Sequence, residues 1–307
     1  MKKVSIIGGG GNVGASAGLY LAERGICEVV LVDIVDGVPQ GKGLDLREAR
    51  SVRGYDSPVA GTSDFADIAG SDVVLVTAGF PRKPGMSRTD LLLKNAEIVG
   101  SVAGNIKKHA PDAFVVVVSN PLDVMTYHMM KQTGFPANRV VGMAGVLDAT
   151  RFRCFIADEL GVAATDVHAM VLGGHGDSMV PLPRYATVSG VPITDLLDDA
   201  AIARLVDRTA KGGGEIVALL KTGSAFYAPA ASAAQMVEAI LLDTKRFLPA
   251  AAYCDGQYGV KDVYVGVPVI LGAGGVERIV ELPLSEGELE KLRASAKEVA
   301  AAIAELP

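Results

Sequence analysis

Short apolar runs alternate with amphipathic segments through the first half of the chain. The apolar runs are rich in β-branched residues and occupy positions 4–7, 28–33, 72–77, 113–119 and 139–142. A continuous run such as 114–118 is typical of a strand in a parallel sheet that is covered on both faces. Helices are predicted between the runs, over 13–24, 42–53, 88–109 and 122–133. This alternation predicts right-handed crossovers and a doubly wound parallel α/β sheet.

The pattern changes after about residue 146. A helix is predicted over 148–161, a strand over 166–172, longer helices over 195–221 and 229–243, and two or three strands within 247–272. The last helix begins with a Ser-x-x-Glu capping box formed by Ser285 and Glu288, ahead of an apolar face of Leu289, Leu292, Val299 and Ile303. These elements predict a second, α+β domain, so that residues 1–145 form one domain and 146–307 the other. No Ser/Pro-rich linker separates the two, and we expect them to pack closely.

The composition supports layers of helices on a sheet. The chain has 307 residues, enough for about two domains at roughly 150 residues each. Half of the residues are hydrophobic, but only 8 Phe and 8 Tyr are present and Trp is absent, so the core must consist of Val, Ile, Leu and Ala. The 36 glycines are numerous for this length and indicate tight turns.

Charge and cysteine content narrow the function classes. The net charge of −6 argues against nucleic acid or an anionic membrane as a partner, but permits a small anion held by a local cluster of cations. The uncharged stretches at 4–22, 222–237 and 263–276 are interrupted by Gly or Pro, so neither a signal peptide nor a membrane span is expected. Cys27, Cys154 and Cys254 lack metal-ligand spacing, so no metal site is expected and a cytoplasmic location is predicted.

The first strand runs into a possible dinucleotide-binding turn. Residues Gly9–Gly14 match G-x-G-x-x-G, although a flexible turn is equally consistent with this hexapeptide alone. Asp33 ends the second apolar run 19 residues after Gly14, where a carboxylate can accept hydrogen bonds from an adenosine ribose and repel a 2′-phosphate. The pattern therefore favours a Rossmann-type domain that binds NAD rather than NADP. The run of four glycines, Gly8–Gly11, leaves the register of the turn open by one residue.

Two further segments carry polar residues beyond strand ends. The loop at 78–88 contains Arg82, Lys83 and Arg88, which form either a local positive patch or a solvated surface. Asn120 follows the strand at 113–119 and precedes Pro121, which indicates an amide at the sheet edge or an Asx-type turn.

A third set of polar residues lies at the start of the second half. Asp148 and Arg151 are three residues apart on a predicted helix and can share a face, although an N-cap Asp with an incidental Arg fits as well. His175 stands in Gly-Gly-His-Gly-Asp, where small neighbours expose the imidazole for proton transfer. The other histidines, His109, His128 and His168, have helical or strand neighbours typical of surface or packing residues.

Together these motifs resemble the lactate and malate dehydrogenase family over essentially the whole chain, and within it the malate dehydrogenases of lactate-dehydrogenase-like architecture. The family usually has one glycine fewer in the first turn. The resemblance rests on five ordered segments: Gly9–Gly14 with Asp33, Pro81–Met86 with Arg88, Asp90 and Leu91, Val118–Pro121, Gly145–Phe152, and Gly173–Asp177.

The resemblance implies reversible oxidation of (S)-malate to oxaloacetate by hydride transfer to NAD. His175 would accept the hydroxyl proton, and Asp148 would orient the imidazole and stabilise its charged form. Arg151 would bind the C1 carboxylate, Arg88 would polarise the reacting carbonyl, and Asn120 would contact substrate and cofactor. The implied cofactor-binding residues are Gly8, Gly9, Gly10, Gly11, Asn12, Val13, Gly14, Asp33, Asn95, Val118, Ser119 and Asn120.

Arg82 would select the substrate. Lactate dehydrogenases resemble this pattern but have a neutral Gln where Arg82 falls, so an Arg here favours a dicarboxylate. The loop around Arg82 is also expected to act as a lid, with Gly79 and Gly85 permitting movement. The family resemblance further implies a homodimer or homotetramer, for which the Ala-rich segment 228–239 is either an interface or a buried helix.

Three other functions stay open at this point. L-lactate dehydrogenase is the nearest alternative, and the oxaloacetate and pyruvate activities would separate the two. NAD-dependent glycosidases resemble the superfamily but are longer and need a Cys/His metal site. A non-catalytic NAD-sensing protein would need the glycine turn but not His175, Asp148 and the substrate arginines.

Overall fold

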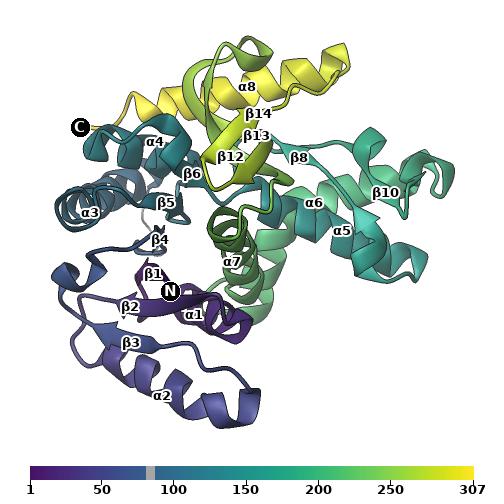
Figure 1. Ribbon diagram of the computed structural model, residues 1–307. Coiled ribbons are helices and arrows are strands. Elements are labelled where there is room, and N and C mark those ends of the chain that lie inside the picture. The colour runs from purple at the N-terminus through teal and green to yellow at the C-terminus, as the bar shows by residue number, and fades with distance from the viewer. Residues whose placement is uncertain (81–86) are drawn as a thin grey trace.

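The computed structural model describes residues 1–80 and 87–307, and Figure 1 shows a twisted sheet with helices on both sides. Nine strands of the described residues form this sheet, in the order β14-β13-β12-β6-β5-β4-β1-β2-β3. Their bounds are β1 (Lys2–Ile7), β2 (Cys27–Val32), β3 (Val59–Thr62), β4 (Val73–Val76), β5 (Phe114–Val117), β6 (Val140–Gly142), β12 (Arg246–Asp255), β13 (Lys261–Gly272) and β14 (Gly275–Ile279). Strands β1–β6 are all parallel, in the order of a doubly wound dinucleotide-binding sheet. The predicted fold class is confirmed.

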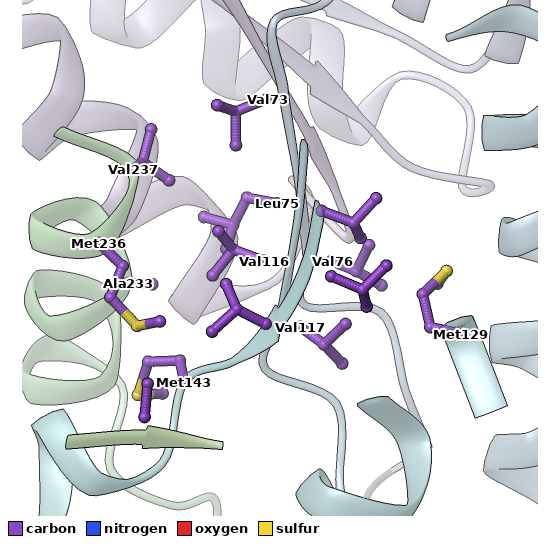
Figure 2. Close-up of a cluster of buried hydrophobic side chains, with 14 of the residues drawn as sticks. Val73, Leu75, Val76, Val116, Val117, Met129, Met143, Ala233, Met236 and Val237 are labelled. Atoms are coloured by element: carbon purple, nitrogen blue, oxygen red, sulfur yellow. The ribbon is translucent and has the colours of Figure 1, made fainter. Parts of the chain in front are cut away.

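Helices cover both faces of the sheet. They are α1 (Asn12–Arg24), α2 (Val38–Arg53), α3 (Arg88–His109), α4 (Leu122–Thr133), α5 (Gly145–Leu160), α6 (Asp199–Leu220), α7 (Tyr227–Leu241) and α8 (Glu286–Ile303). Figure 2 shows Leu75 and Val116 pointing toward Met236 of α7, whereas Val76 points to the opposite side, where Met129 of α4 lies. Side chains alternate across a strand, so both faces of β4 are buried and its sequence is apolar throughout.

Three strands of the second half extend this sheet, whereas its shorter strands form two small separate sheets. Strand β12 pairs antiparallel with β6 through Ala251 and Gly142, and β13 and β14 follow at the same edge. Helix α7, also from the second half, packs on α1 and on β4 and β5. The Ala-rich segment predicted as an interface or a buried helix is therefore a buried helix, with Ala230 and Ala233 fully covered.

Several element boundaries differ from the sequence predictions. Helix α2 begins at Val38 because Gly37, with φ of 83°, and a proline in the first turn start it early. Helix α5 begins at Gly145 rather than at 148. The strand predicted over 166–172 is two short strands, because its halves pair with different partners. The first half, β7 (Val167–His168), pairs with β10 (Thr187–Val188), and β10 also pairs with β11 (Val191–Pro192). The second half, β8 (Val171–Leu172), pairs with β9 (Val180–Pro181).

Other predicted features agree with the structure. Helices α3 and α4 have the predicted bounds, and α8 has both hydrogen bonds of the predicted capping box at Ser285 and Glu288. Leu292 and Val299 lie in the core. Within residues 1–80 and 87–307, no helix combines the length and apolarity required to cross a membrane.

Candidate active site

The glycine-rich turn connects β1 to α1 at the carboxyl end of the sheet. Gly8 has φ of 85°, and the main-chain nitrogens of Gly8 and Gly9 each donate to the Val32 carbonyl at 2.9 Å. A Cβ on Gly14 would lie 2.5 Å from the Gly8 carbonyl oxygen, so no larger residue fits there. Gly8 and Gly14 thus form the close contact of the turn, and the loop between them is one residue longer than the G-x-G-x-x-G spacing. A Cβ on Gly14 would also lie 2.9 Å from Gly9 Cα, so both Gly8 and Gly9 pack against the start of α1.

Asp33 lies directly against this turn. The Gly10 nitrogen donates to Asp33 Oδ2 at 3.0 Å, and the Val35 nitrogen donates to Oδ1 at 3.3 Å. A Cβ on Gly10 would lie 2.7 Å from Asp33 Oδ2. The glycine turn therefore forms a backbone-lined cradle beside a half-buried carboxylate, at the amino end of α1. These are the groups that a pyrophosphate and a ribose require.

Polar residues also follow β4, which pairs with β1, and β5, the next strand along the sheet. Asn95 of α3 is 1% exposed and links the two strand ends: its side chain donates to the Asn120 carbonyl at 2.7 Å and accepts from the Phe80 nitrogen at 2.6 Å. Ser119 is also buried and donates to the Ala78 carbonyl. Asn120 is exposed, and its bond to Pro121 is cis. Both buried side chains bind protein main chain, whereas Asn120 lies open at the sheet edge.

The second polar group centres on Asp148 in the first turn of α5. Asp148 is 2% exposed, and its two oxygens contact different partners: Oδ2 is 3.0 Å from His175 Nδ1, and Oδ1 is 3.4 Å from Arg151 Nη1. Arg151 is one helical turn further along α5, as the spacing predicted. Glycines of α6 leave room for it, since a Cβ on Gly212 would lie 3.2 Å from Arg151 Cδ. The structure therefore brings His175, Asp148 and Arg151 together.

The environment of the imidazole favours its protonated form. Burial lowers the pKa of His175, but the charge and hydrogen bond of Asp148 and the charge of Asp123 outweigh burial, so its pKa is raised above 6.5. Burial also lowers the pKa of Arg151, an effect that Asp148 opposes. Since Asp148 holds Nδ1, Nε2 is the ring nitrogen that exchanges protons with a ligand.

Of the two arginines predicted in the loop 78–88, only Arg88 is among the described residues. Arg88 is the first residue of α3, and its guanidinium lies 3.6 Å from the Asp177 carboxylate with both side chains exposed. Arg82, with the whole segment Pro81–Met86 and the expected lid, lies outside the described residues.

Asp123, one residue inside α4, is a site residue that sequence reasoning missed. Its Oδ2 accepts a hydrogen bond of 2.8 Å from the main-chain nitrogen of His175. The available signal was a carboxylate among the buried residues Leu122, Val124 and Met125.

The described part of the chain has no group of three His, Cys, Asp or Glu side chains arranged so that it could hold a metal ion. Cys27 and Cys254 are buried and unpaired, and Cys154 is exposed. His128 is buried and contacts the Ala96 carbonyl, which confirms a packing role.

Comparisons with known proteins identify the families and folds that this chain resembles. The family model described as lactate/malate dehydrogenase, NAD binding domain, matches residues 2–142, and the one described as lactate/malate dehydrogenase, alpha/beta C-terminal domain, matches residues 145–306. The malate dehydrogenase of Roseiflexus castenholzii is 55% identical over 304 residues, which cover 99% of this chain and 98% of that protein. The malate dehydrogenase of Methanosarcina mazei is 55% identical over 306 residues, covering 100% and 99%.

Two solved structures show the same fold. Malate dehydrogenase from Salinibacter ruber superposes with a TM-score of 0.95 at 53% identity, covering 99% of this chain and 97% of that one. Lactate dehydrogenase from Cryptosporidium parvum, complexed with lactic acid and nicotinamide adenine dinucleotide, has a TM-score of 0.95 at 45% identity, covering 100% and 99%. The similar structures thus include both a malate dehydrogenase and a lactate dehydrogenase.

Proposed function

Because this chain belongs to the lactate/malate dehydrogenase family, we propose that it catalyses the reversible, NAD-dependent oxidation of (S)-malate to oxaloacetate. The observation that carries the proposal is the position of Asp148, whose two oxygens contact His175 at 3.0 Å and Arg151 at 3.4 Å. One buried carboxylate thereby joins a proton acceptor to a carboxylate-binding cation. A protein that only senses NAD has no use for this arrangement.

His175 is proposed as the general acid and base. In malate oxidation, Nε2 takes the proton of the C2 hydroxyl while the C2 hydride leaves for NAD, and the C–O bond becomes a carbonyl. Asp148 keeps the proton of neutral His175 on Nδ1 and stabilises the imidazolium that forms. In oxaloacetate reduction, the same nitrogen returns its proton to the developing alkoxide.

Three further side chains are proposed to bind the substrate. Arg151 binds the C1 carboxylate through two parallel hydrogen bonds, a geometry that the planar guanidinium allows and a lysine does not. Arg88 polarises the C2 carbonyl, and the exposed amide of Asn120 binds the substrate beside the cofactor. Arg88 must leave Asp177, an exposed contact of 3.6 Å that solvent already weakens.

The proposed cofactor site fits NAD, which supplies the hydride acceptor when bound. Gly8–Gly14 with Asn12 and Val13 cradle the pyrophosphate, and Asp33 binds the adenosine ribose. Asn95, Val118 and Ser119 are proposed to shape the nicotinamide end. The main-chain hydrogen bonds of Asn95 and Ser119 support this shaping role rather than direct contact.

The preference for a dicarboxylate rests on Arg82 in the sequence. We expect NADH oxidation to be faster with oxaloacetate than with pyruvate, because pyruvate would leave the Arg82 cation without a partner. Steady-state assays with each substrate, and with NADH and NADPH in turn, measure both preferences. Faster turnover of pyruvate would favour lactate dehydrogenase, and faster turnover with NADPH would contradict the role of Asp33.

Replacing Arg82 with glutamine is expected to reverse the substrate preference. Loss of a charge-assisted pair worth about 1.5–3 kcal/mol should lower kcat/KM for oxaloacetate by roughly 10- to 100-fold and raise that for pyruvate. The matched control is Lys83→Gln, which removes the neighbouring cation. Equal effects of Arg82→Gln on the two substrates would show that this residue is not the selector.

We also propose the arrangement of the whole molecule. Residues 1–145 hold the cofactor, and 146–307 supply His175, Asp148 and Arg151; the two family matches, which meet between 142 and 145, support this division. A homodimer or homotetramer is supported by exposed apolar side chains such as Leu219 and Tyr227, which are 75% and 65% exposed. The proposed cytoplasmic location is supported by the three unpaired cysteines.

A further inference from the structure

The turn that carries His175 is held by three elements that are distant in the sequence. Gly173 exchanges main-chain hydrogen bonds of 2.9 and 3.0 Å with Gly266 of β13. The Gly174 nitrogen donates to Ser295 Oγ of α8 at 2.8 Å, and the His175 nitrogen donates to Asp123 Oδ2 of α4 at 2.8 Å. Each anchor binds main chain, so together they determine where the imidazole lies.

Asp123 differs from the other two anchors in carrying a charge. Its carboxyl group is 4% exposed, and in the described residues Oδ1 has no hydrogen-bond partner. Burying a carboxylate without a paired cation is unfavourable. A neutral acceptor is sufficient for a main-chain N–H, as Ser295 shows on the adjacent residue. The charge of Asp123 must therefore be balanced by another group of the cluster.

We propose that Asp123 is a positioning residue for the reaction, which binds the main chain of His175 and uses its negative charge to stabilise the protonated imidazole. The inference deepens the proposed function and rests on it. Asp148 acts on the ring directly through Nδ1, whereas Asp123 acts through the backbone and across space. Two buried carboxylates thus raise the pKa of one imidazole, whereas the charge of Arg151 lowers it.

The electrostatic effects on the two groups agree with this geometry. Burial raises the pKa of Asp123 to about 6, against the hydrogen bond from His175 and the charge of its ring, while Asp148 raises that pKa further. The charge of Asp123 in turn helps to raise the pKa of His175. Helix α8 and strand β13 face the turn with the neutral hydroxyl of Ser295 and the main chain of Gly266. The charges of Asp123 and His175 therefore influence each other's pKa, so the two titrations are coupled.

The test compares variants that separate charge from hydrogen bonding. Asp123→Asn keeps an acceptor oxygen for the His175 nitrogen but removes the charge, so the pKa of His175 should fall by about one unit, a tenfold loss of proton affinity. Malate oxidation needs neutral His175, so the acid limb of its pH–rate profile should move to lower pH. Oxaloacetate reduction needs the protonated ring, so its alkaline limb should also move to lower pH.

Two further variants serve as controls. Ser295→Ala loosens the same turn without changing charge, so its kcat should fall while its pH midpoints stay at the wild-type values. Asp123→Ala removes both the charge and the acceptor, so its kcat should fall and its midpoints should move as in Asp123→Asn. Wild-type midpoints in folded Asp123→Asn protein would overturn the inference.

Histidine titration by NMR makes the test independent of turnover. His175 is assigned by the signal lost in His175→Gln, and its pKa is measured in wild-type protein and in Asp123→Asn without substrate. A lower pKa in Asp123→Asn supports the inference even if oxaloacetate proves not to be the substrate. If that variant does not fold, the same titration of Asp123→Ala decides: a His175 pKa equal to that of wild type would overturn the inference.

Discussion

Replacing His175 with alanine is expected to lower kcat for both oxaloacetate reduction and malate oxidation by about 10²- to 10⁴-fold, the usual contribution of a general acid or base. Asp148 Oδ2 and Asp123 Oδ2 both contact His175, one at the ring and one at the backbone. Alanine removes only the ring, so the turn keeps its anchors. Steady-state assays of NADH oxidation with oxaloacetate and of NADH formation with malate measure the loss in the two directions.

NADH binding separates this effect from damage to the fold. Fluorescence titration should give a Kd for NADH within about threefold of wild type, because the glycine turn and Asp33 follow β1 and β2, apart from the histidine turn. The matched control is His168→Ala, which removes an exposed histidine from the same half of the chain and should leave kcat unchanged. A His175→Ala enzyme within tenfold of wild type would assign proton transfer to another group.

The second large effect is expected at Arg151. Replacement with glutamine removes two charge-assisted hydrogen bonds to the substrate carboxylate, each worth about 1.5–3 kcal/mol, so kcat/KM for oxaloacetate should fall by roughly 10²- to 10⁴-fold. Most of the loss should appear as a raised KM if the carboxylate is bound equally in the ground and transition states. NADH binding should persist, as measured by the same titration.

The variant Arg151→Lys tests whether a positive charge alone is enough to bind the substrate carboxylate. It keeps the charge beside Asp148 but not the planar fork, so Arg151→Lys should recover only part of the lost kcat/KM. Arg204→Gln is the matched control, because Arg204 is an exposed arginine of α6 that pairs with Glu159. Full activity in Arg151→Lys would show that a point charge is enough and that bidentate binding is not required.

The parts of the fold and site that could be predicted are those encoded by local pattern. The apolar runs predicted the parallel strands, and the i, i+3 spacing of Asp148 and Arg151 placed both on one face of α5. The Ser285 capping box predicted the start of α8. In each case the interacting groups are a few residues apart, so sequence spacing determines their geometry.

What could not be predicted depends on pairing between distant segments. Asp123 contacts His175 across 52 residues, and no spacing rule connects the two. The strand expected over 166–172 divides because its two ends join different sheets. Strand β3 was missed because it is only four residues long and includes Gly61, whose missing side chain admits the backbone of Pro39.

The continuous sheet makes the two halves dependent on each other during folding. Strand β6 is bordered by β12, which the ribosome adds about a hundred residues later, and Leu75 and Val116 are covered by α7 (Figure 2). A nascent or truncated chain that ends near residue 145 therefore presents an open strand edge and an uncovered apolar face, the two features that promote aggregation. We therefore expect the proposed cofactor-binding half, residues 1–145, to aggregate when it is produced without the second half.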